Sequence, residues 1–355
     1  MTVLTGYIAR AVLKSALIAL LFLLALFNVF TLSDELQDMG KGQYDLMAVF
    51  QYVLLTSPRV FYELVPSSAL LGSLFALGNM ANDRELIAMR AAGWSVLQII
   101  QAVLLAGAVL ATLAVLVGEW VAPASERAAQ ILRSTAQGKQ FLVQGQSGLW
   151  LREGQQFINI KSLTEAGELQ DVRIYRYDAR QQLQQMITAE RGVFQQSGRW
   201  LLESAHIQRL NGLDLSQHHY PTLDWPSSIN PKVLDVVTVS PENMSLYDLG
   251  VYVNFLQKNQ QRAQVFELAF WSRLINPLVI FVMLMVSAPF VIGVKRGINF
   301  GTRLMIGVGI GLTFNIVDKM VGHLSVIYHW NPLLMTLIPS MMMLVFALYA
   351  MRKVV

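Results

Sequence analysis

The sequence contains no cysteine and few charged residues, and both shortages restrict what the protein can be. Without cysteine the chain has no disulfide, no thiolate nucleophile and no cysteine ligand for a metal. Asp, Glu, Lys and Arg make up 14% of the 355 residues, whereas a soluble domain has about 25%. Hydrophobic residues make up 54%. This balance is typical of a membrane protein.

The usual sequence patterns for binding nucleic acid, nucleotides and metals are also missing. Basic residues are scattered singly and the formal net charge is only +4, so no nucleic acid is expected as a partner. No G-x-x-x-x-G-K-[ST] pattern occurs, so any ATP that drives this protein is expected to be hydrolysed by another chain. The histidines include no helical i, i+4 pair with a carboxylate, and no nucleophile or paired carboxylates emerge. We therefore predict no catalytic residue and no metal site.

Long apolar stretches contain most of the hydrophobic residues. Crossing the hydrocarbon layer takes roughly 20 mostly apolar residues. Six stretches reach or approach that length: Ile8 to Leu32, Val60 to Met80, Val96 to Val117, Phe270 to Val294, Leu304 to Ile327 and Leu333 to Ala350. The first is too long for a signal-peptide core, so we expect it to be retained. The sequence predicts an α-helical membrane protein with six transmembrane helices.

The basic residues near these stretches predict their orientation. One side of the six-span pattern collects nine of them: Arg10, Lys14, Arg84, Arg90, Lys295, Arg296, Arg303, Arg352 and Lys353. The short loops on the other side hold chiefly two bases and three acids: Lys41, Arg59, Asp34, Glu35 and Asp38. By the positive-inside rule both termini are cytoplasmic.

The segment between the third and fourth spans differs in composition from the rest of the chain. It is rich in polar residues and β-formers, and its short apolar runs are broken by turn-like pairs such as Glu153-Gly154. We expect an inserted all-β domain, a sandwich or jelly-roll-like fold, outside the cytoplasm and on helical stalks. The predicted division is 1–120 for spans one to three, 121–268 for the β-domain and 269–355 for spans four to six.

The loop between the second and third spans is predicted to form a short cytoplasmic helix near residues 82–92, capped by Asn82 and stopped by Gly93. It offers charged and apolar side chains to a soluble partner: Asp83, Arg84, Glu85, Leu86, Ile87, Met89 and Trp94. The alternative is an ordinary helical hairpin at the membrane surface.

Charged residues within the predicted spans are further candidates. A carboxylate in hydrocarbon is costly unless it is paired or hydrated, so Asp318 is either functional or, with Lys319, an anchor at the outer end of its helix. Arg273 in the fourth span could extend outward to lipid headgroups. A glycine series before Asp318 lets another helix approach closely and suggests a mobile or subunit-facing surface: Gly307, Gly309 and Gly311.

Several short sequence motifs support a family resemblance over essentially the whole chain. The most specific is Gly118 to Pro123, and the others are Gly40-x-Gly42-x-Tyr44-Asp45, Leu70-Leu71-Gly72, Glu85-Leu86, Gly148-Leu149-Trp150, Trp271-Ser272 and Asp318. With three spans on each side of a β-domain, the chain resembles the lipopolysaccharide export permeases of the LptF and LptG family, and is more similar to the G-type subunit.

This resemblance implies a permease subunit of an ABC transporter. It would extract lipopolysaccharide from the bacterial inner membrane and pass it to a periplasmic β-jelly-roll bridge toward the outer membrane. The implied partners are an LptF-type permease, an LptB-type ATPase dimer that carries the ATP and magnesium, an LptC-type bridge protein, lipopolysaccharide and membrane lipid. No cofactor is implied for this chain.

The resemblance also implies roles for individual residues. Glu85 would be the acidic residue of a coupling helix that docks on the ATPase, with Asp83, Arg84, Leu86 and Met89 around it. The lipid-cavity candidates are Leu23, Phe27, Phe30, Leu64, Phe314 and Asp318. G-type members can carry phosphate-binding lysines at the outer end of the first span, where this chain has Thr31, Gln37 and Asp38. Lys41, Arg59 or the partner permease could replace them.

Two other functions remain open from the residues alone. A related permease could carry another lipid or a lipoprotein. A membrane-anchored receptor could bind a periplasmic ligand through its β-domain, although a receptor does not explain the need for six spans and an apolar cytoplasmic helix. Co-purification with an ATPase would separate a transporter from a receptor.

Overall fold

The structure is a computed structural model that describes residues 3–137, 148–164, 167–178, 182–195, 199–211, 214–227, 229, 240–292 and 300–352. The chain divides into two compact units. A helical unit comprises Met1–Asp38, Val49–Ala129 and Gln264–Val355, and a β unit comprises Met39–Ala48 and Gln130–Ala263.

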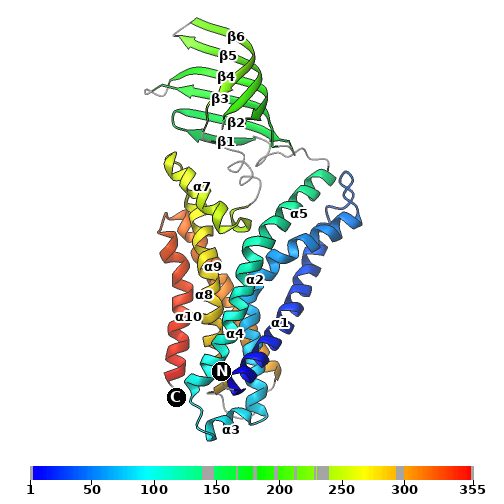
Figure 1. The fold of residues 1–355 in the computed structure, drawn as a ribbon, viewed down its shortest axis with the longest axis vertical. Helices are drawn as coiled ribbons and strands as arrows, with labels where there is room; N and C mark the ends of the chain where they lie inside the picture. The colour runs from blue at the N-terminus through cyan, green and yellow to red at the C-terminus, as the bar shows by residue number, and fades with distance from the viewer. Residues whose placement is uncertain are drawn as a thin grey trace. The chain divides into compact units, whose positions relative to one another are not determined.

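The helical unit is built from long apolar helices (Figure 1). Its helices are α1 (Val3–Leu36), α2 (Leu46–Asn82), α3 (Glu85–Ala91), α4 (Val96–Leu116), α8 (Gln264–Ile292), α9 (Phe300–Ile327) and α10 (Pro332–Arg352). A π-helical turn, η1 (Val117–Val121), leads from α4 into α5 (Ala122–Ala136). Among the described residues, six helices are long and apolar enough to cross a membrane: α1, α2, the run from α4 through α5, α8, α9 and α10. The predicted helical fold class is confirmed.

Helix α2 forms the centre of the helical unit. Of its most apolar stretch 72% is buried, against 17% for α1 and α9. Its Leu70 and Leu77 are fully buried in one cluster with side chains of α1, α4 and α8. At Gly72 a Cβ atom would lie 2.3 Å from the Cα of Ala16, so α1 and α2 touch backbone to backbone. Only a residue without a side chain permits this crossing.

The glycine series of α9 also contacts α2. A Cβ at Gly307 would meet Leu74 at 2.7 Å, and one at Gly311 would meet Ser67 at 3.8 Å, while Gly309 has nothing within 4 Å. The close approach predicted from the sequence is therefore made, for two of these glycines, by a helix of the same chain.

The β unit contains a sheet inserted between the helices, which confirms the predicted β-domain. Its described strands are β1 (Leu149–Glu153), β2 (Gln156–Leu163), β3 (Leu169–Tyr177), β4 (Leu183–Phe194), β5 (Trp200–Asn211) and β6 (Asp214–Trp225). These strands form one six-stranded antiparallel sheet in the order of the sequence, as Figure 1 shows. The unit also contains a 3₁₀ turn (Pro241–Asn243) and α7 (Leu246–Lys258).

One face of the sheet is apolar because isoleucines pair across four strands. Ile158 of β2 pairs with Ile174 of β3, which pairs with Ile187 of β4 and then Ile207 of β5. Trp200, also buried, donates from its indole N–H to the carbonyl of Ile229 at 2.7 Å. All four isoleucines are buried, and such cross-strand pairs stabilise a sheet.

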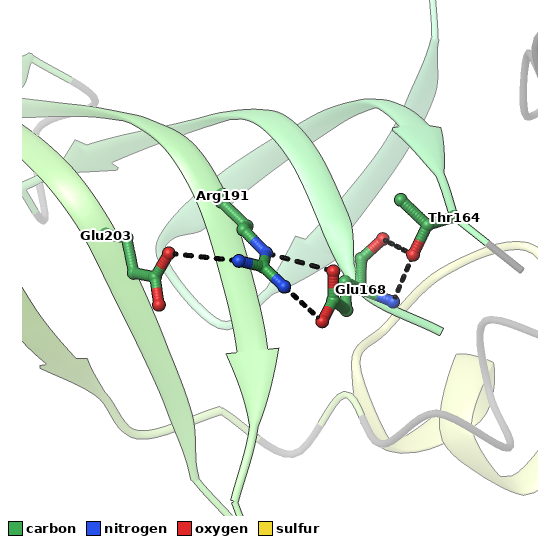
Figure 2. Close-up of polar contacts among 4 residues, drawn as sticks. All are labelled: Thr164, Glu168, Arg191 and Glu203. Carbon is green, nitrogen blue, oxygen red and sulfur yellow. Dashed lines mark hydrogen bonds and ion pairs between the residues drawn. The ribbon is translucent and has the colours of Figure 1, made fainter. Parts of the chain in front are cut away.

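The sheet also carries an exposed polar cluster, drawn in Figure 2. The Arg191 guanidinium donates to both carboxylate oxygens of Glu168, at 2.9 Å for Nε, and lies 3.6 Å from Glu203. The turn that precedes Glu168 is closed by Thr164, whose Oγ1 accepts a hydrogen bond from the Glu168 backbone N–H at 3.1 Å. Hydrogen bonding to Glu168 raises the pKa of Arg191. Since Arg191 and Glu203 are exposed and Glu168 is only partly buried, we expect this cluster to add little stability.

Candidate functional site

The short helix α3 lies between α2 and α4, where the sequence predicts a coupling helix. Arg84 precedes it with a left-handed backbone, at a φ of 63°, and gives no side-chain cap. The predicted cap, Asn82, is instead the last residue of α2. Gly93 ends the hairpin as predicted: its φ is 92°, and the N–H of Trp94 bonds the carbonyl of Met89 at 3.0 Å. A glycine accepts this left-handed conformation without strain.

The side chains of α3 divide between the core and the surface. Leu86 and Met89 are buried in the core cluster of this chain's own helical unit. Ile87 is 53% exposed, and Asp83 and Arg84 are also exposed. The apolar candidates therefore fix α3 to the helices behind it, while the charged residues and Ile87 are accessible to a partner.

Glu85 is held by Tyr7, a residue that the sequence analysis does not single out. The hydroxyl of Tyr7, near the start of α1, lies 3.1 Å and 3.0 Å from the two carboxylate oxygens of Glu85 and donates a hydrogen bond to this carboxylate. A tyrosine in the first turns of an apolar helix is ordinary, and the two residues are 78 positions apart. No sequence signal identifies this contact.

The end of the helical unit that carries α3 also carries the beginning of α1 and the end of α10 (Figure 1). Exposed basic side chains on these elements and on α3 belong to the group that predicted the orientation: Arg10, Lys14, Arg84, Arg90 and Arg352. Lys295, Arg296, Lys353 and the side chain of Arg303 lie outside the described residues. This common end is the one that the positive-inside rule assigns to the cytoplasm.

The lipid-cavity candidates occupy different environments. On α1, Phe27 and Phe30 are 46% and 60% exposed, and Leu23 packs partly against the core cluster. Leu64 of α2 and Phe314 of α9 are buried in that cluster. The structure of the single chain therefore leaves only the α1 phenylalanines openly accessible.

Asp318 is half-buried on α9, one turn beyond Asn315. The Asn315 amide donates to the carbonyl of Gly311 at 2.9 Å and to Ser67 Oγ of α2 at 3.4 Å. The middle of α9 is thus tied to α2 one turn before Asp318.

Arg59 of α2, one candidate for contacting lipid phosphates, already has acidic neighbours. Its Nε lies 3.4 Å from the buried carboxylate of Glu126, and its Nη1 lies 3.6 Å from Glu63. These two carboxylates offset its charge, so Arg59 is a weaker phosphate ligand than an unpaired arginine would be.

A buried ion pair joins three helices of the helical unit. Arg273 Nε of α8 lies 2.7 Å from Glu119 Oε1 of η1, and the Arg273 guanidinium also donates to the carbonyl of Gly118. Its charge lies 5.2 Å from the ring centroid of Tyr62 of α2, and the Tyr62 hydroxyl donates to the Arg273 carbonyl at 3.2 Å. Arg273 therefore points inward to a partner and does not extend to headgroups.

The motif Gly118-Glu119-Trp120 is explained by the contacts around this ion pair. A Cβ at Gly118 would lie 2.5 Å from the Tyr62 ring, so a glycine is needed for the ring to approach. The π-helical turn at Val117–Val121 contains the carboxylate that meets Arg273, and such turns are common at functional sites. The available sequence signal was an arginine inside the fourth predicted span and an acid two residues beyond the third, because a lone charge in hydrocarbon is costly.

Comparison with known proteins gives a consistent result along the whole chain. The family described as "Lipopolysaccharide export system permease LptF/LptG" matches residues 6–353. The lipopolysaccharide export system permease protein LptG of Escherichia coli strain K12 is 29% identical over 353 residues, covering 99% of this chain and 98% of that protein. LptG of Haemophilus influenzae is 28% identical over 340 residues, covering 96% of this chain and 95% of that protein.

Proposed function

Since the chain belongs to the LptF/LptG family of lipopolysaccharide export system permeases, we propose that it is a permease subunit that moves lipopolysaccharide out of the bacterial inner membrane. The observation that carries this proposal is a β unit inserted into six candidate membrane spans, within a family match that covers nearly every residue. The subunit transports and does not itself perform covalent chemistry.

The arrangement of apolar surface supports a lipid as the cargo. The outer half of α1 exposes large apolar side chains, among them Phe22, Phe27 and Phe30. Within a membrane these side chains face acyl chains, whether of bulk lipid or of a lipid in transit. An amphipathic lipid must also find apolar surface once it leaves the bilayer. In the β unit the isoleucine row is apolar, but it is buried in the single chain.

The proposed assembly places the remaining functions on partners. An LptF-type permease would complete the lipid cavity beside α1 and α9, an LptB-type ATPase dimer would bind α3, and an LptC-type protein would continue the β-sheet path. The ATPase would hold ATP and magnesium. The exposed residues of α3 support the second contact, because Asp83, Arg84 and Ile87 are accessible while Leu86 and Met89 anchor the helix.

The proposed location is the inner membrane, with both termini in the cytoplasm and the β unit in the periplasm. Support comes from the exposed basic residues at the end of the helical unit that carries α3, since lysine and arginine favour the cytoplasmic side.

Lipid analysis of the purified assembly tests the proposal. The chain is expressed with an LptF-type permease and an LptB-type ATPase, extracted in mild detergent, and the retained lipid is identified by mass spectrometry. We expect lipopolysaccharide and a stably bound ATPase. Retention of a different lipid or a lipoprotein would favour the related permease, and failure of any ATPase to co-purify would favour the receptor.

A further inference from the structure

The first half of helix α1 packs closely against other helices, and its second half is much less buried. Its first turns pack through Ile8 and Val12 into the core cluster that also contains Leu86 and Met89 of α3. At Ala16 its backbone meets Gly72 of α2. Beyond Leu20 the residues of α1 are half-buried or exposed up to Glu35.

The Tyr7 hydroxyl makes a polar contact between α1 and the carboxylate of α3. It reaches both Glu85 oxygens at hydrogen-bond distance, from a tyrosine that is 48% exposed. A hydrogen bond to a charged acceptor is stronger than one between neutral groups. It therefore holds the Glu85 carboxylate next to the start of α1.

Through these contacts a movement of α3 would also move the start of α1. Tyr7 is nine residues before the Ala16 crossing and Phe30 is fourteen after it, which correspond to about 13 Å and about 21 Å of helix. If α1 tilts about its backbone contact with Gly72, a displacement at Tyr7 produces a larger one at Phe30. Asn28, whose amide donates to Ser57 of α2 at 3.0 Å, is the contact that such a tilt would stretch.

We propose that Tyr7 is a positioning residue that orients Glu85 and transmits displacement of α3 to α1. This inference rests on the proposed function, because α3 moves only if a partner ATPase binds it. It assigns to the start of the first span a part in energy coupling that is distinct from docking. Docking would use the exposed residues Asp83, Arg84 and Ile87, whereas Tyr7 contacts Glu85 from α1.

Two single variants separate the hydrogen bond from the charge. Tyr7→Phe keeps the ring and the Glu85 charge but removes the donor. Glu85→Gln keeps an acceptor for Tyr7 but removes the charge. A matched control, Tyr247→Phe, removes a hydroxyl from an exposed tyrosine of α7 in the β unit. Glu85→Ala removes the acceptor and provides the background for a double-variant cycle.

The experiment uses the full complex with its partner permease and ATPase in proteoliposomes, and measures lipopolysaccharide released per ATP hydrolysed. We expect Tyr7→Phe to lower this ratio about three- to tenfold, with unchanged ATPase binding and KM for ATP, because a typical hydrogen bond contributes about 0.5 to 1.5 kcal/mol and about 1.4 kcal/mol corresponds to tenfold. Adding Tyr7→Phe to Glu85→Ala should lower the ratio no further, and Tyr247→Phe should match the parent.

A normal ratio in Tyr7→Phe would overturn the inference. It would also be overturned if Tyr7→Phe lowered the ratio by the same factor in the Glu85→Ala background as in the parent, since Tyr7 would then act without Glu85. A lower thermal midpoint with an unchanged ratio would assign Tyr7 a purely structural role and overturn it as well. Failure of the proposed function looks different, because the parent complex would then release no lipopolysaccharide or bind no ATPase.

Discussion

Arg273 and Glu119 form an ion pair, at 2.7 Å between Nε and Oε1, that links parts of the chain 154 residues apart. Their side chains are only 6% and 21% exposed. The pair ties the fourth span to the end of the third, and Tyr62 adds the second span. The two halves of the helical unit, separated in sequence by the whole β unit, are thus joined by a contact that neither half can make alone.

Removing one member of this pair should destabilise the helical unit strongly. Arg273→Met leaves the Glu119 carboxylate without its main partner, and loss of one member of a buried pair costs about 3 to 5 kcal/mol. Arg273→Lys should lie between parent and Met, because lysine keeps the charge but loses the planar donor set. Thermal unfolding in detergent measures the effect, with Lys161→Gln on the sheet surface as control. Equal thermal midpoints for Arg273→Met and the control would contradict the buried role.

The Gly72 crossing gives a prediction with an internal control. Gly72→Ala should destabilise by about 1 to 3 kcal/mol, because the new methyl group would overlap the α1 backbone. Gly309→Ala meets no atom within 4 Å and should be neutral or stabilising, since alanine favours helix by about 1 kcal/mol. Unfolding midpoints of the two variants measured side by side give the comparison, and a reversed order would disprove the backbone contact.

Glu85→Lys should impair coupling while leaving the fold intact. Reversing one charge of a desolvated interface pair costs about 2 to 5 kcal/mol of association, so we expect weaker ATPase binding or slower export with normal membrane insertion. Glu85→Gln separates charge from shape: retained binding with slower export would assign the charge to transmission of force. Pull-down of the ATPase and export in proteoliposomes provide the measurements. Normal values in Glu85→Lys would reduce α3 to a surface hairpin.

The orientation of the chain can be tested with fused reporters. A reporter fused after Gly154, in the turn between β1 and β2, should lie in the periplasm. A reporter fused after Arg90 of α3 should lie in the cytoplasm. The basic residues at the end that carries α3 are the physical reason. Reversal of both results would exclude the transporter scheme.

In the β unit, a buried hydrogen bond should contribute more to the free energy of unfolding than an exposed ion pair does. Trp200→Phe removes the 2.7 Å bond to the Ile229 carbonyl and leaves a small cavity, a loss of about 1 to 3 kcal/mol. Arg191→Gln breaks the exposed cluster of Figure 2 and should cost below about 1 kcal/mol. Hydrogen exchange of the strands in the full chain measures both. Greater loss of protection in Arg191→Gln than in Trp200→Phe would contradict this ranking.

Several features of the fold were predictable because their signals are local. The apolar stretches predicted the spans, since hydrocarbon requires a helix long enough to satisfy its own backbone. The turn-like pairs predicted strands, and Glu153-Gly154 is indeed the turn between β1 and β2. Gly93 predicted the end of α3. The prediction that Asn82 caps α3 was wrong, because a residue that favours helix caps can also occupy the last turn of the preceding helix.

The candidate residues show where local signals end. Leu86 and Phe30 are both apolar and both were assigned to a functional surface, yet Leu86 is buried and Phe30 is 60% exposed. Hydrophobicity gives the cost of exposure to water, but in a membrane an apolar side chain is satisfied by lipid as well as by protein. Sequence alone cannot separate these two environments.

The sequence by itself determined the spans, the inserted β-domain and the family, because these follow from composition, periodicity and short words read along the chain. Tertiary structure alone decided that Gly72 meets Ala16, that Tyr7 holds Glu85 and that Arg273 pairs with Glu119. Each of these contacts depends on which helices become neighbours and at what rotation, and that is fixed only when the apolar faces of α1, α2, α4 and α8 pack together.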